Sequence, residues 1–157
     1  MIKEEVILEL VNKKLEGTSK FLVSVKVRPA NKIVVFFDDE ASGVGVADCV
    51  ELSKYIESNL NRDIEDFELE VSSPGMDQPL MVHRQYIKTI GKQVNVLLKQ
   101  GEKHSGKLTA VTENGINIEK STRERTDTSK KKRELVTENI FVQFSEIKET
   151  RRIVSFN

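Results

Sequence analysis

The fold of this chain of 157 residues is decided by the stretch LEVSSPGMDQPL at positions 69–80. Its beginning continues an alternation of apolar and polar side chains over residues 67–73, which is typical of a β-strand with one buried face. Ser73-Pro74-Gly75 then ends the strand, because proline lacks a backbone N–H and glycine tolerates left-handed dihedral angles. We therefore expect a domain boundary in this stretch, and we predict one domain at residues 1–80 and a second at residues 81–157.

The sequence before this stretch predicts a helix, a hairpin and a second helix. Apolar residues recur at helical spacing in residues 2–15 and again from about 46 to 60, whereas residues 21–27 and 32–37 are β-rich runs around a Pro29-Ala30-Asn31 turn. With the strand that follows, the order α-β-β-α-β requires both helices to stack on one three-stranded sheet. The residues predicted to share a face within each element are Ile2, Val6, Ile7, Leu10 and Val11, then Phe21, Val23, Val25 and Val27, and then Val46, Cys49, Val50, Ser53, Ile56 and Leu60.

The sequence after this stretch predicts a short helix and a run of short strands. The helix covers residues 83–90, and Asn114-Gly115 is a strong signal for a hairpin turn. A single turn at residues 145–147 precedes the last strand. Short strands in this arrangement favour a small SH3-like (Sm-like) β-barrel, whose closure hides its strand edges. The predicted fold class is therefore α+β, and the predicted barrel strands are residues 92–99, 106–112, 115–119, 140–144 and 148–155.

The formal net charge of zero hides a strong asymmetry between the two halves of the chain. Residues 1–80 carry 9 Lys and Arg against 16 Asp and Glu, a net charge of −7. Residues 81–157 carry 16 Lys and Arg against 9 Asp and Glu, a net charge of +7. Such asymmetry indicates two surfaces with different partners. The basic half suits RNA phosphates or an acidic protein, and the acidic half suits a basic protein.

The composition argues against membrane and secreted proteins. No apolar run approaches the roughly 18 residues that a membrane-spanning helix needs. The N-terminus MIKEEVILEL carries glutamates where a secretory signal has a basic flank and an apolar stretch. The single cysteine, Cys49, excludes a disulfide framework and fits a reducing compartment. We therefore predict a cytoplasmic protein that has no membrane partner.

The sequence offers no arrangement that is typical of a catalytic, metal or cofactor site. Gly43-Val44-Gly45 is too short for a dinucleotide fingerprint, and His83 and His104 lack the ligand spacing of a structural metal site. Ser72 and Ser73 lack the surroundings of an activated serine nucleophile. We therefore predict that the protein is not an enzyme and that it holds no metal and no cofactor.

The stretch at residues 69–80 closely resembles the signature of the RimP family of ribosome maturation factors, which reads LEVSSPG-x-DRPL. Residues 45–53, GVADCVELS, are similar to the start of a helix in that family, and residues 144–152, FSEIKETRR, resemble its last two barrel strands. The resemblance therefore spans both predicted domains. Two positions depart from the family pattern, because Gln78 replaces an arginine and Ala47 replaces one of two paired acids.

The resemblance implies a non-enzymatic factor that binds the free small (30S) ribosomal subunit and assists its assembly. The implied partners are rRNA and a ribosomal protein near the decoding site, and we expect the factor to be a monomer. The main alternative is an Sm-like RNA-binding regulator that acts on mRNA or small RNA. A hydrolase is a third and weaker alternative. Because Sm-like proteins usually close rings, a monomeric state would count against the Sm-like alternative.

The signature itself is predicted to fix the joint between the two domains. In this hypothesis, Asp77 accepts backbone N–H bonds at the start of the turn beyond Pro79. A second hypothesis is that the exposed rim of Ser72 and Ser73 contacts the ribosomal subunit directly. The residues assigned to the joint are Ser72, Ser73, Pro74, Gly75, Asp77 and Pro79.

A basic segment between Glu119 and Glu138 is the candidate for RNA contact. Its Ser, Thr and Asp content favours a loop without regular structure. Its cations would neutralise rRNA phosphates without reading the sequence, and the alternative is a solvated loop whose charge keeps the protein soluble. The candidate contacts are Arg123, Arg125, Lys130, Lys131, Lys132 and Arg133.

Overall fold

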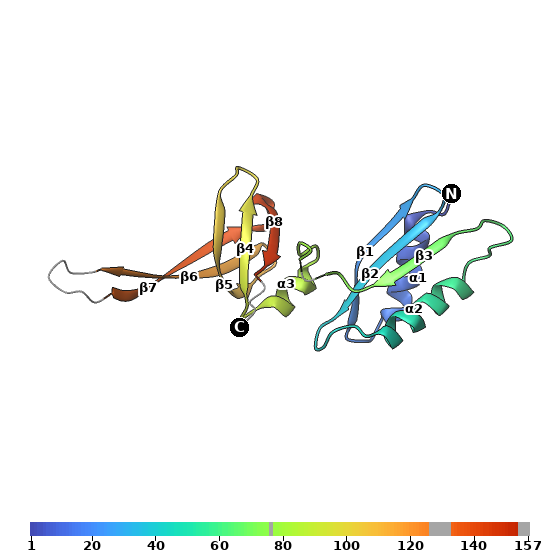
Figure 1. Cartoon of the computed structure of the whole chain (residues 1–157), viewed down its shortest axis with the longest axis horizontal. Coiled ribbons are helices and arrows are strands. Elements are labelled where there is room, and N and C mark those ends of the chain that lie inside the picture. The colour runs from blue at the N-terminus through green and yellow to red at the C-terminus, as the bar shows by residue number, and fades with distance from the viewer. Residues whose placement is uncertain (76, 126–132, 154–157) are drawn as a thin grey trace. The chain divides into compact units, whose positions relative to one another are not determined.

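The computed structural model of the chain describes residues 1–75, 77–125 and 133–153 (Figure 1). The chain divides into two compact units, Met1–Gly75 and Met76–Asn157, and each is described by itself. The division falls inside the LEVSSPGMDQPL stretch, so one half of the stretch belongs to each unit.

The first unit is a three-stranded sheet with two helices, in the predicted order α-β-β-α-β. Strands β1 and β2 form an antiparallel hairpin, and β3 pairs in parallel with β2, so β2 is central and β3 is an edge strand. The helices α1 and α2 contact each other and pack on the sheet. The bounds of these elements are α1 Glu4–Leu15, β1 Lys20–Arg28, β2 Lys32–Asp39, α2 Val46–Ser58 and β3 Glu68–Ser72.

Apolar residues from both helices and from the sheet form the core of the first unit. The centre of this core is β2, where Ile33, Val35 and Phe37 alternate along one face and are fully buried. The predicted inward residues of β3 and its approach join the same cluster, which confirms that part of the pattern. The other members are Ile7, Val11 and Leu15 of α1, Val25 of β1, Leu52 and Ile56 of α2, and Phe67, with Leu69 and Val71 packed against them.

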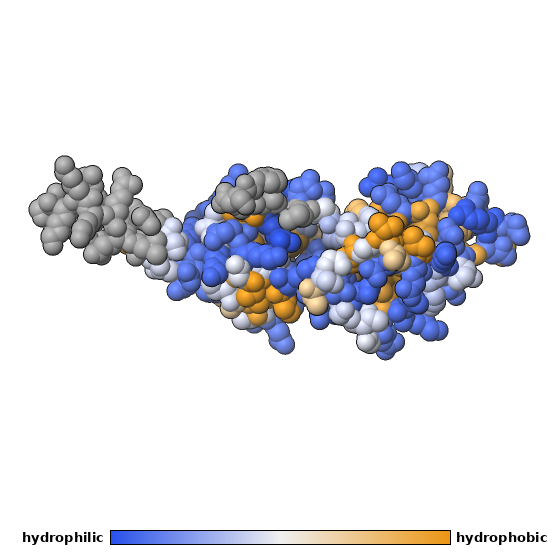
Figure 2. Space-filling view, turned by 60° about the horizontal axis from the view of Figure 1, so that its bottom comes forward, coloured by the Kyte–Doolittle hydropathy of each residue, from blue (hydrophilic) through white to orange (hydrophobic). Residues whose placement is uncertain are grey.

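The predicted apolar face of α2 is partly wrong. Val46 is 82% exposed and Val50 is 45% exposed, while Leu52 is buried together with Ile56. The inward stripe therefore includes Cys49, Leu52 and Ile56, because the spacing of three and four residues keeps these side chains on one helical face. Figure 2 shows apolar patches among mostly hydrophilic residues on the face that it draws.

A β-bulge changes the alternation that was predicted for β1. The pairing with β2 shifts between Leu22 and Ser24, so that Leu22 lies opposite Phe37. One extra residue in a strand reverses the face of every side chain that precedes it. Leu22 therefore packs on the core with Val25 and Val27, and the prediction that Phe21 shares their face is wrong.

The second unit is a short helix followed by five antiparallel strands, as predicted. The strand order is β7-β6-β5-β4-β8, which leaves β7 and β8 at the edges of the described pairings. Closure into an SH3-like barrel stays a prediction. The bounds are α3 His83–Thr89, β4 Gln93–Leu98, β5 Lys103–Val111, β6 Gly115–Arg125, β7 Arg133–Gln143, the 3-10 helix η1 Phe144–Glu146 and β8 Ile147–Arg152.

The core of the second unit lies on one face of this sheet. The predicted alternation in β4 is confirmed, because Val94, Val96 and Leu98 are all buried. The predicted Asn114-Gly115 hairpin is also confirmed, with the Thr112 backbone N–H donating to the Gly115 carbonyl at 2.8 Å. The remaining members of this core are Tyr86, Leu108, Ile116, Ile118, Val142 and Ile147.

Candidate functional site

The first half of the signature is the edge strand β3 and its exit. Ser72 is the last residue of β3 and lies opposite Phe36 of the central strand. Ser72 is half-buried, whereas Ser73 and Gly75 are exposed and Pro74 is half-buried. Polar side chains are therefore available to solvent where the sheet of the first unit ends.

The second half of the signature is held by the last strand of the second unit. The Leu80 backbone N–H donates to the Thr150 carbonyl at 2.8 Å, and the Leu80 side chain packs against the second core. The Arg151 guanidinium donates to the Asp77 carbonyl oxygen, and its Nε lies 3.1 Å from Glu149 Oε1. The bond from Arg151 is also the main reason that the pKa of Glu149 is lowered. Both ends of residues 77–80 are thus tied to β8.

The helix after the signature is capped by a residue of its own first turn. Gln85 is buried, and its Oε1 accepts the backbone N–H groups of Met81 at 2.6 Å and Val82 at 3.0 Å. Val82 is the N-cap of α3, so these bonds satisfy donors that the helix itself leaves without a partner. The prediction that Asp77 caps this turn is therefore wrong. The carbonyl of Asp77, not its carboxylate, makes the contact described above.

An aromatic cluster fixes α3 against β8 and η1. The Tyr86 hydroxyl donates to Thr150 Oγ1 at 2.9 Å, and both residues are buried. The ring of Phe144 meets the rings of Tyr86 and His83 edge-on, at centroid distances of 5.1 and 5.8 Å. Burial raises the pKa of Tyr86, so the hydroxyl stays protonated and serves as a fixed donor. The helix therefore has a defined position on its own sheet.

The two ends of the predicted basic loop are strands that pair with each other and form a two-stranded ribbon. Strand β5 pairs with β6 as far as Glu119, but β6 continues to pair with β7 as far as the Arg125–Arg133 pair. Figure 1 shows these two strands running on beyond the rest of their sheet. We call residues 120–125 and 133–138 the basic ribbon. The prediction of irregular structure is wrong for these residues.

The ribbon contains half of the predicted RNA contacts. Arg123 and Arg125 lie on β6, and Arg133 is the first residue of β7. Because these strands are paired in register, the ribbon presents its basic positions on a hydrogen-bonded backbone instead of a loose chain. Lys130, Lys131 and Lys132 lie outside the described residues.

A second group of cations was missed by the sequence analysis. Arg152, the last residue of β8, lies opposite Val94 of β4, and Lys92 precedes Val94 by two residues. Arg152 and then burial and Lys88 lower the pKa of Lys92. We call Lys88, Lys92 and Arg152 the cation cluster. The four-residue spacing of Lys88 and Lys92 was a sequence signal for two of its three residues, but nothing in the sequence adds Arg152.

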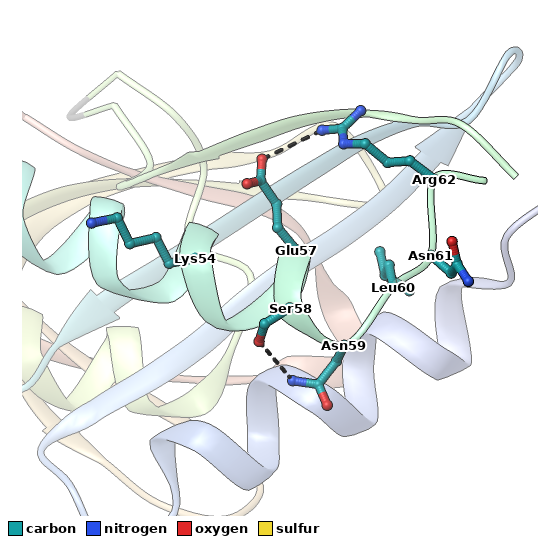
Figure 3. A pocket seen from close by; sticks show the side chains of 7 residues that line it. All are labelled: Lys54, Glu57, Ser58, Asn59, Leu60, Asn61 and Arg62. Carbon is teal, nitrogen blue, oxygen red and sulfur yellow. Dashed lines mark hydrogen bonds and ion pairs between the residues drawn. The ribbon is translucent and has the colours of Figure 1, made fainter. Parts of the chain in front are cut away.

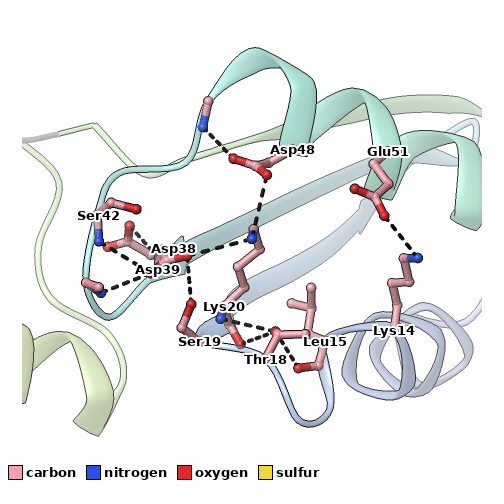
Figure 4. A network of polar contacts seen from close by, with 12 residues as sticks. Lys14, Leu15, Thr18, Ser19, Lys20, Asp38, Asp39, Ser42, Asp48 and Glu51 are labelled. Atoms are coloured by element: carbon pink, nitrogen blue, oxygen red, sulfur yellow. Dashed lines mark hydrogen bonds and ion pairs between the residues drawn. The ribbon is translucent and has the colours of Figure 1, made fainter.

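In the first unit, by contrast, a lysine lies between carboxylates (Figure 4). Lys20 Nζ is 3.7 Å from Asp39 Oδ2 and 3.6 Å from Asp48 Oδ1. Asp39 is buried, and its Oδ1 accepts the backbone N–H groups of Ala41 at 2.9 Å and Ser42 at 3.3 Å. The bond from Ala41 is the main reason that the pKa of Asp39 is lowered. This network ties the loop after β2 to α2 and β1.

A surface hollow at the end of α2 is lined in part by Arg62, whose contacts hold the fold (Figure 3). Arg62 lies 3.4 Å from Glu57 and 2.9 Å from Asp66. The Arg62 guanidinium also donates to the Phe67 carbonyl at 2.7 Å and lies 4.0 Å from the centre of the Phe67 ring. Because these contacts use the guanidinium to hold the approach to β3, we assign the hollow no ligand.

Comparison with known proteins identifies the family of the chain. The RimP N-terminal domain matches residues 10–77. A protein named ribosome maturation factor RimP from Porphyromonas gingivalis strain W83 is 38% identical over 154 residues, which cover 98% of this chain and 100% of the relative. Proteins of the same name from Christiangramia forsetii and Flavobacterium psychrophilum are 35% and 33% identical, and each match covers 99% of this chain and 100% of the relative. The chain belongs to the RimP family.

The match to the RimP N-terminal domain coincides with the first unit. It begins within α1 and ends at Asp77, just beyond the last residue of that unit. The signature of this RimP-family chain is therefore the exit of the N-terminal domain, followed by residues that β8 holds in the second unit.

The described residues of this RimP-family chain give no support to a metal site, a membrane-spanning helix or a reactive cysteine. Within residues 1–75, 77–125 and 133–153, no three His, Cys, Asp or Glu residues gather as a metal site would require. No helix in the same ranges is long and apolar enough to cross a membrane. Cys49 packs on the first core, and burial, with a smaller effect of Asp48, raises the pKa of its thiol. A thiol of raised pKa is a weak nucleophile.

Proposed function

We propose that the chain is a non-enzymatic, cytoplasmic ribosome maturation factor that binds the free small (30S) subunit during its assembly. The observation that carries this proposal is the full-length similarity to proteins named ribosome maturation factor RimP. The opposite charges of the two halves fit a partner that is itself made of anionic rRNA and basic proteins.

Each unit has a role in this proposal. The basic second unit faces rRNA, and the acidic first unit faces a ribosomal protein near the decoding site. The second unit is proposed to be an SH3-like barrel that uses the basic ribbon to reach phosphates. Ser72, Ser73, Pro74, Gly75 and Pro79 form the link between the two binding surfaces, and a two-surface monomer gains affinity because the first contact raises the local concentration of the second.

The test is sedimentation of the full chain with ribosomal particles through a sucrose gradient. We expect the chain to migrate with free small subunits and to be absent from assembled ribosomes. Migration with neither particle would overturn the proposal. Migration as a ring-sized oligomer that retains small RNA would instead support the Sm-like alternative.

The role of the basic segment between Glu119 and Glu138 is tested by charge reversal at four of its residues. Each phosphate contact that is lost lowers the slope of log affinity against log salt by about 0.7 to 0.9. A control that reverses four exposed lysines of the first unit has the same net charge, and we expect it to keep the wild-type slope. Equal slopes for the two variants would remove these four residues from the RNA-facing surface. The test variant carries Glu at Lys130, Lys131, Lys132 and Arg133, and the control carries Glu at Lys3, Lys13, Lys26 and Lys54.

A further inference from the structure

We propose that the cation cluster of Lys88, Lys92 and Arg152 is a phosphate-binding site for the rRNA backbone, separate from the basic ribbon. The inference rests on the proposed function and adds a second RNA contact to it. It assigns a ligand to the junction of α3, β4 and β8, where the sequence analysis predicted none.

The fold brings Lys92 and Arg152 together from distant positions in the sequence, and Lys88 lies in the last turn of α3, four residues before Lys92. Val94 and Arg152 are cross-strand partners, and the Ile153 backbone N–H donates to the Gln93 carbonyl at 2.9 Å, which extends the same pairing. Cross-strand and diagonal neighbours lie about 5 to 8 Å apart, so Arg152 is within reach of Lys92. The Lys92 backbone N–H donates to the Thr89 carbonyl at 3.0 Å, which places the lysine directly after α3.

The two arginines at the end of β8 differ in their exposure and in their partners. Arg151 is exposed and is engaged with Glu149 and with the Asp77 carbonyl. Arg152 is half-buried and points to the opposite face, because side chains alternate along a strand. Arg151 therefore holds the signature segment, whereas Arg152 adds its charge to the face that carries Val94.

The electrostatics of the cluster favour an anionic ligand. The pKa of Lys92 is lowered, first by the charge of Arg152, then by burial and then by the charge of Lys88. Like charges held close together are unfavourable in the free protein, and a phosphate between them replaces repulsion with charge-assisted hydrogen bonds. Arginine and lysine differ in shape, since the planar guanidinium binds two phosphate oxygens and the ammonium acts as a point charge. We leave Lys107 of β5 out of the site because Glu119 lies opposite it.

The test compares two double variants of the full chain that lose the same charge. The first is Lys92→Gln with Arg152→Gln. The control is Lys99→Gln with Lys103→Gln, two exposed residues of which the first follows the end of β4 and the second begins β5. Affinity for purified small subunits and for free small-subunit rRNA is measured over a range of salt concentrations.

We expect the cluster variant to lower the log–log salt slope by about 1.4 to 1.8 on both probes, as the loss of two phosphate contacts predicts, and the control to keep the wild-type slope. The melting temperature of the cluster variant should be no lower than that of wild type. A loss of binding can then be assigned to the missing charges and not to unfolding. Equal slopes for the two variants would overturn the site. A loss on subunits without a loss on free rRNA would also overturn it and would indicate an acidic protein surface instead. If wild type binds free rRNA but not subunits, the proposed function fails and the site is judged on free rRNA alone.

Discussion

Two lysines, one in each unit, have opposite electrostatic surroundings. Lys20 of the first unit lies within 4 Å of both Asp39 and Asp48. Lys92 of the second unit has its charged form disfavoured by Arg152 and Lys88. The comparison shows that a positive charge in the first unit serves the fold, since it connects a loop and a helix. In the second unit, Arg152, burial and Lys88 lower the pKa of Lys92 instead of neutralising its charge, and a group of like charges is expected of a surface that binds an anion.

The largest loss of stability is expected from a change in the core of the first unit, and it tests whether the two units unfold independently. Phe37 is fully buried, and Phe37→Ala should cost about 3 to 5 kcal/mol of unfolding free energy through lost packing and a cavity. If the units are independent, hydrogen exchange should accelerate in residues 1–75 while β4, β5 and β6 keep their protection. Equal acceleration in both units would contradict independent folding.

The buried carboxylate beside Lys20 should have the next largest effect. Asp39→Asn removes a charged acceptor for two backbone N–H groups, and it should cost about 1 to 3 kcal/mol at pH 7. Because the pKa of Asp39 is lowered in the folded state, its contribution is present above about pH 4 and is lost as the pH falls through the folded-state value. Chemical unfolding of the variant should therefore show a shallower loss of stability below pH 4. The exposed Asp63→Asn is the control, and an acid response like that of wild type in Asp39→Asn would contradict the assignment.

A smaller effect is expected at the start of α3 in the second unit. Gln85→Ala removes the acceptor for the N–H groups of Met81 and Val82, and the loss of a helix cap costs about 0.5 to 2 kcal/mol. Gln85→Glu keeps a side-chain oxygen that can accept both N–H groups, so it should lose less stability than Gln85→Ala. Exchange of the Met81 and Val82 amides reports the effect directly, and unchanged amide protection in Gln85→Ala would show that another group caps the helix.

The smallest effects test the comparison of the two lysines itself. Lys20→Gln should lower stability by about 0.2 to 1 kcal/mol, the range of partly exposed ion pairs. Lys92→Gln should leave stability unchanged or slightly higher, because the lowered pKa of Lys92 means that its charged form weakens the folded state at neutral pH. Paired denaturant titrations of the two variants measure the difference, and a loss at both positions would remove the distinction between the units.

The order of elements was predictable because each element keeps a regular pattern. The alternation of Phe67, Leu69 and Val71 and that of Val94, Val96 and Leu98 survive in the structure, since a strand with one buried face cannot hide any other pattern. The signature was equally readable, because proline and glycine end a strand by their own geometry.

Three features depend on pairing and therefore could not be predicted from local sequence. The bulge after Leu22 is set by the register with β2. The ribbon that ends at Arg125 and Arg133 is held by backbone hydrogen bonds, which need no apolar pattern in the side chains. The cation cluster requires β8 to lie beside β4, and only that pairing brings Arg152 to Lys92. At the joint, the position of Asp77 before Pro79 is typical of a helix cap, but the cap is Gln85, whose side chain reaches back to the start of its own helix.

The division of the strands between two separate sheets has a consequence for the order in which the protein folds as it is made. The first sheet is complete once Ser72 has been synthesised, because it contains no strand of the second unit. The second sheet lacks one of the two neighbours of β4 until β8 has been made, and Tyr86 lacks its buried hydrogen-bond partner Thr150 until then. Domains generally fold from the N-terminus during synthesis, so the acidic unit folds first and the basic unit follows once β8 has been made.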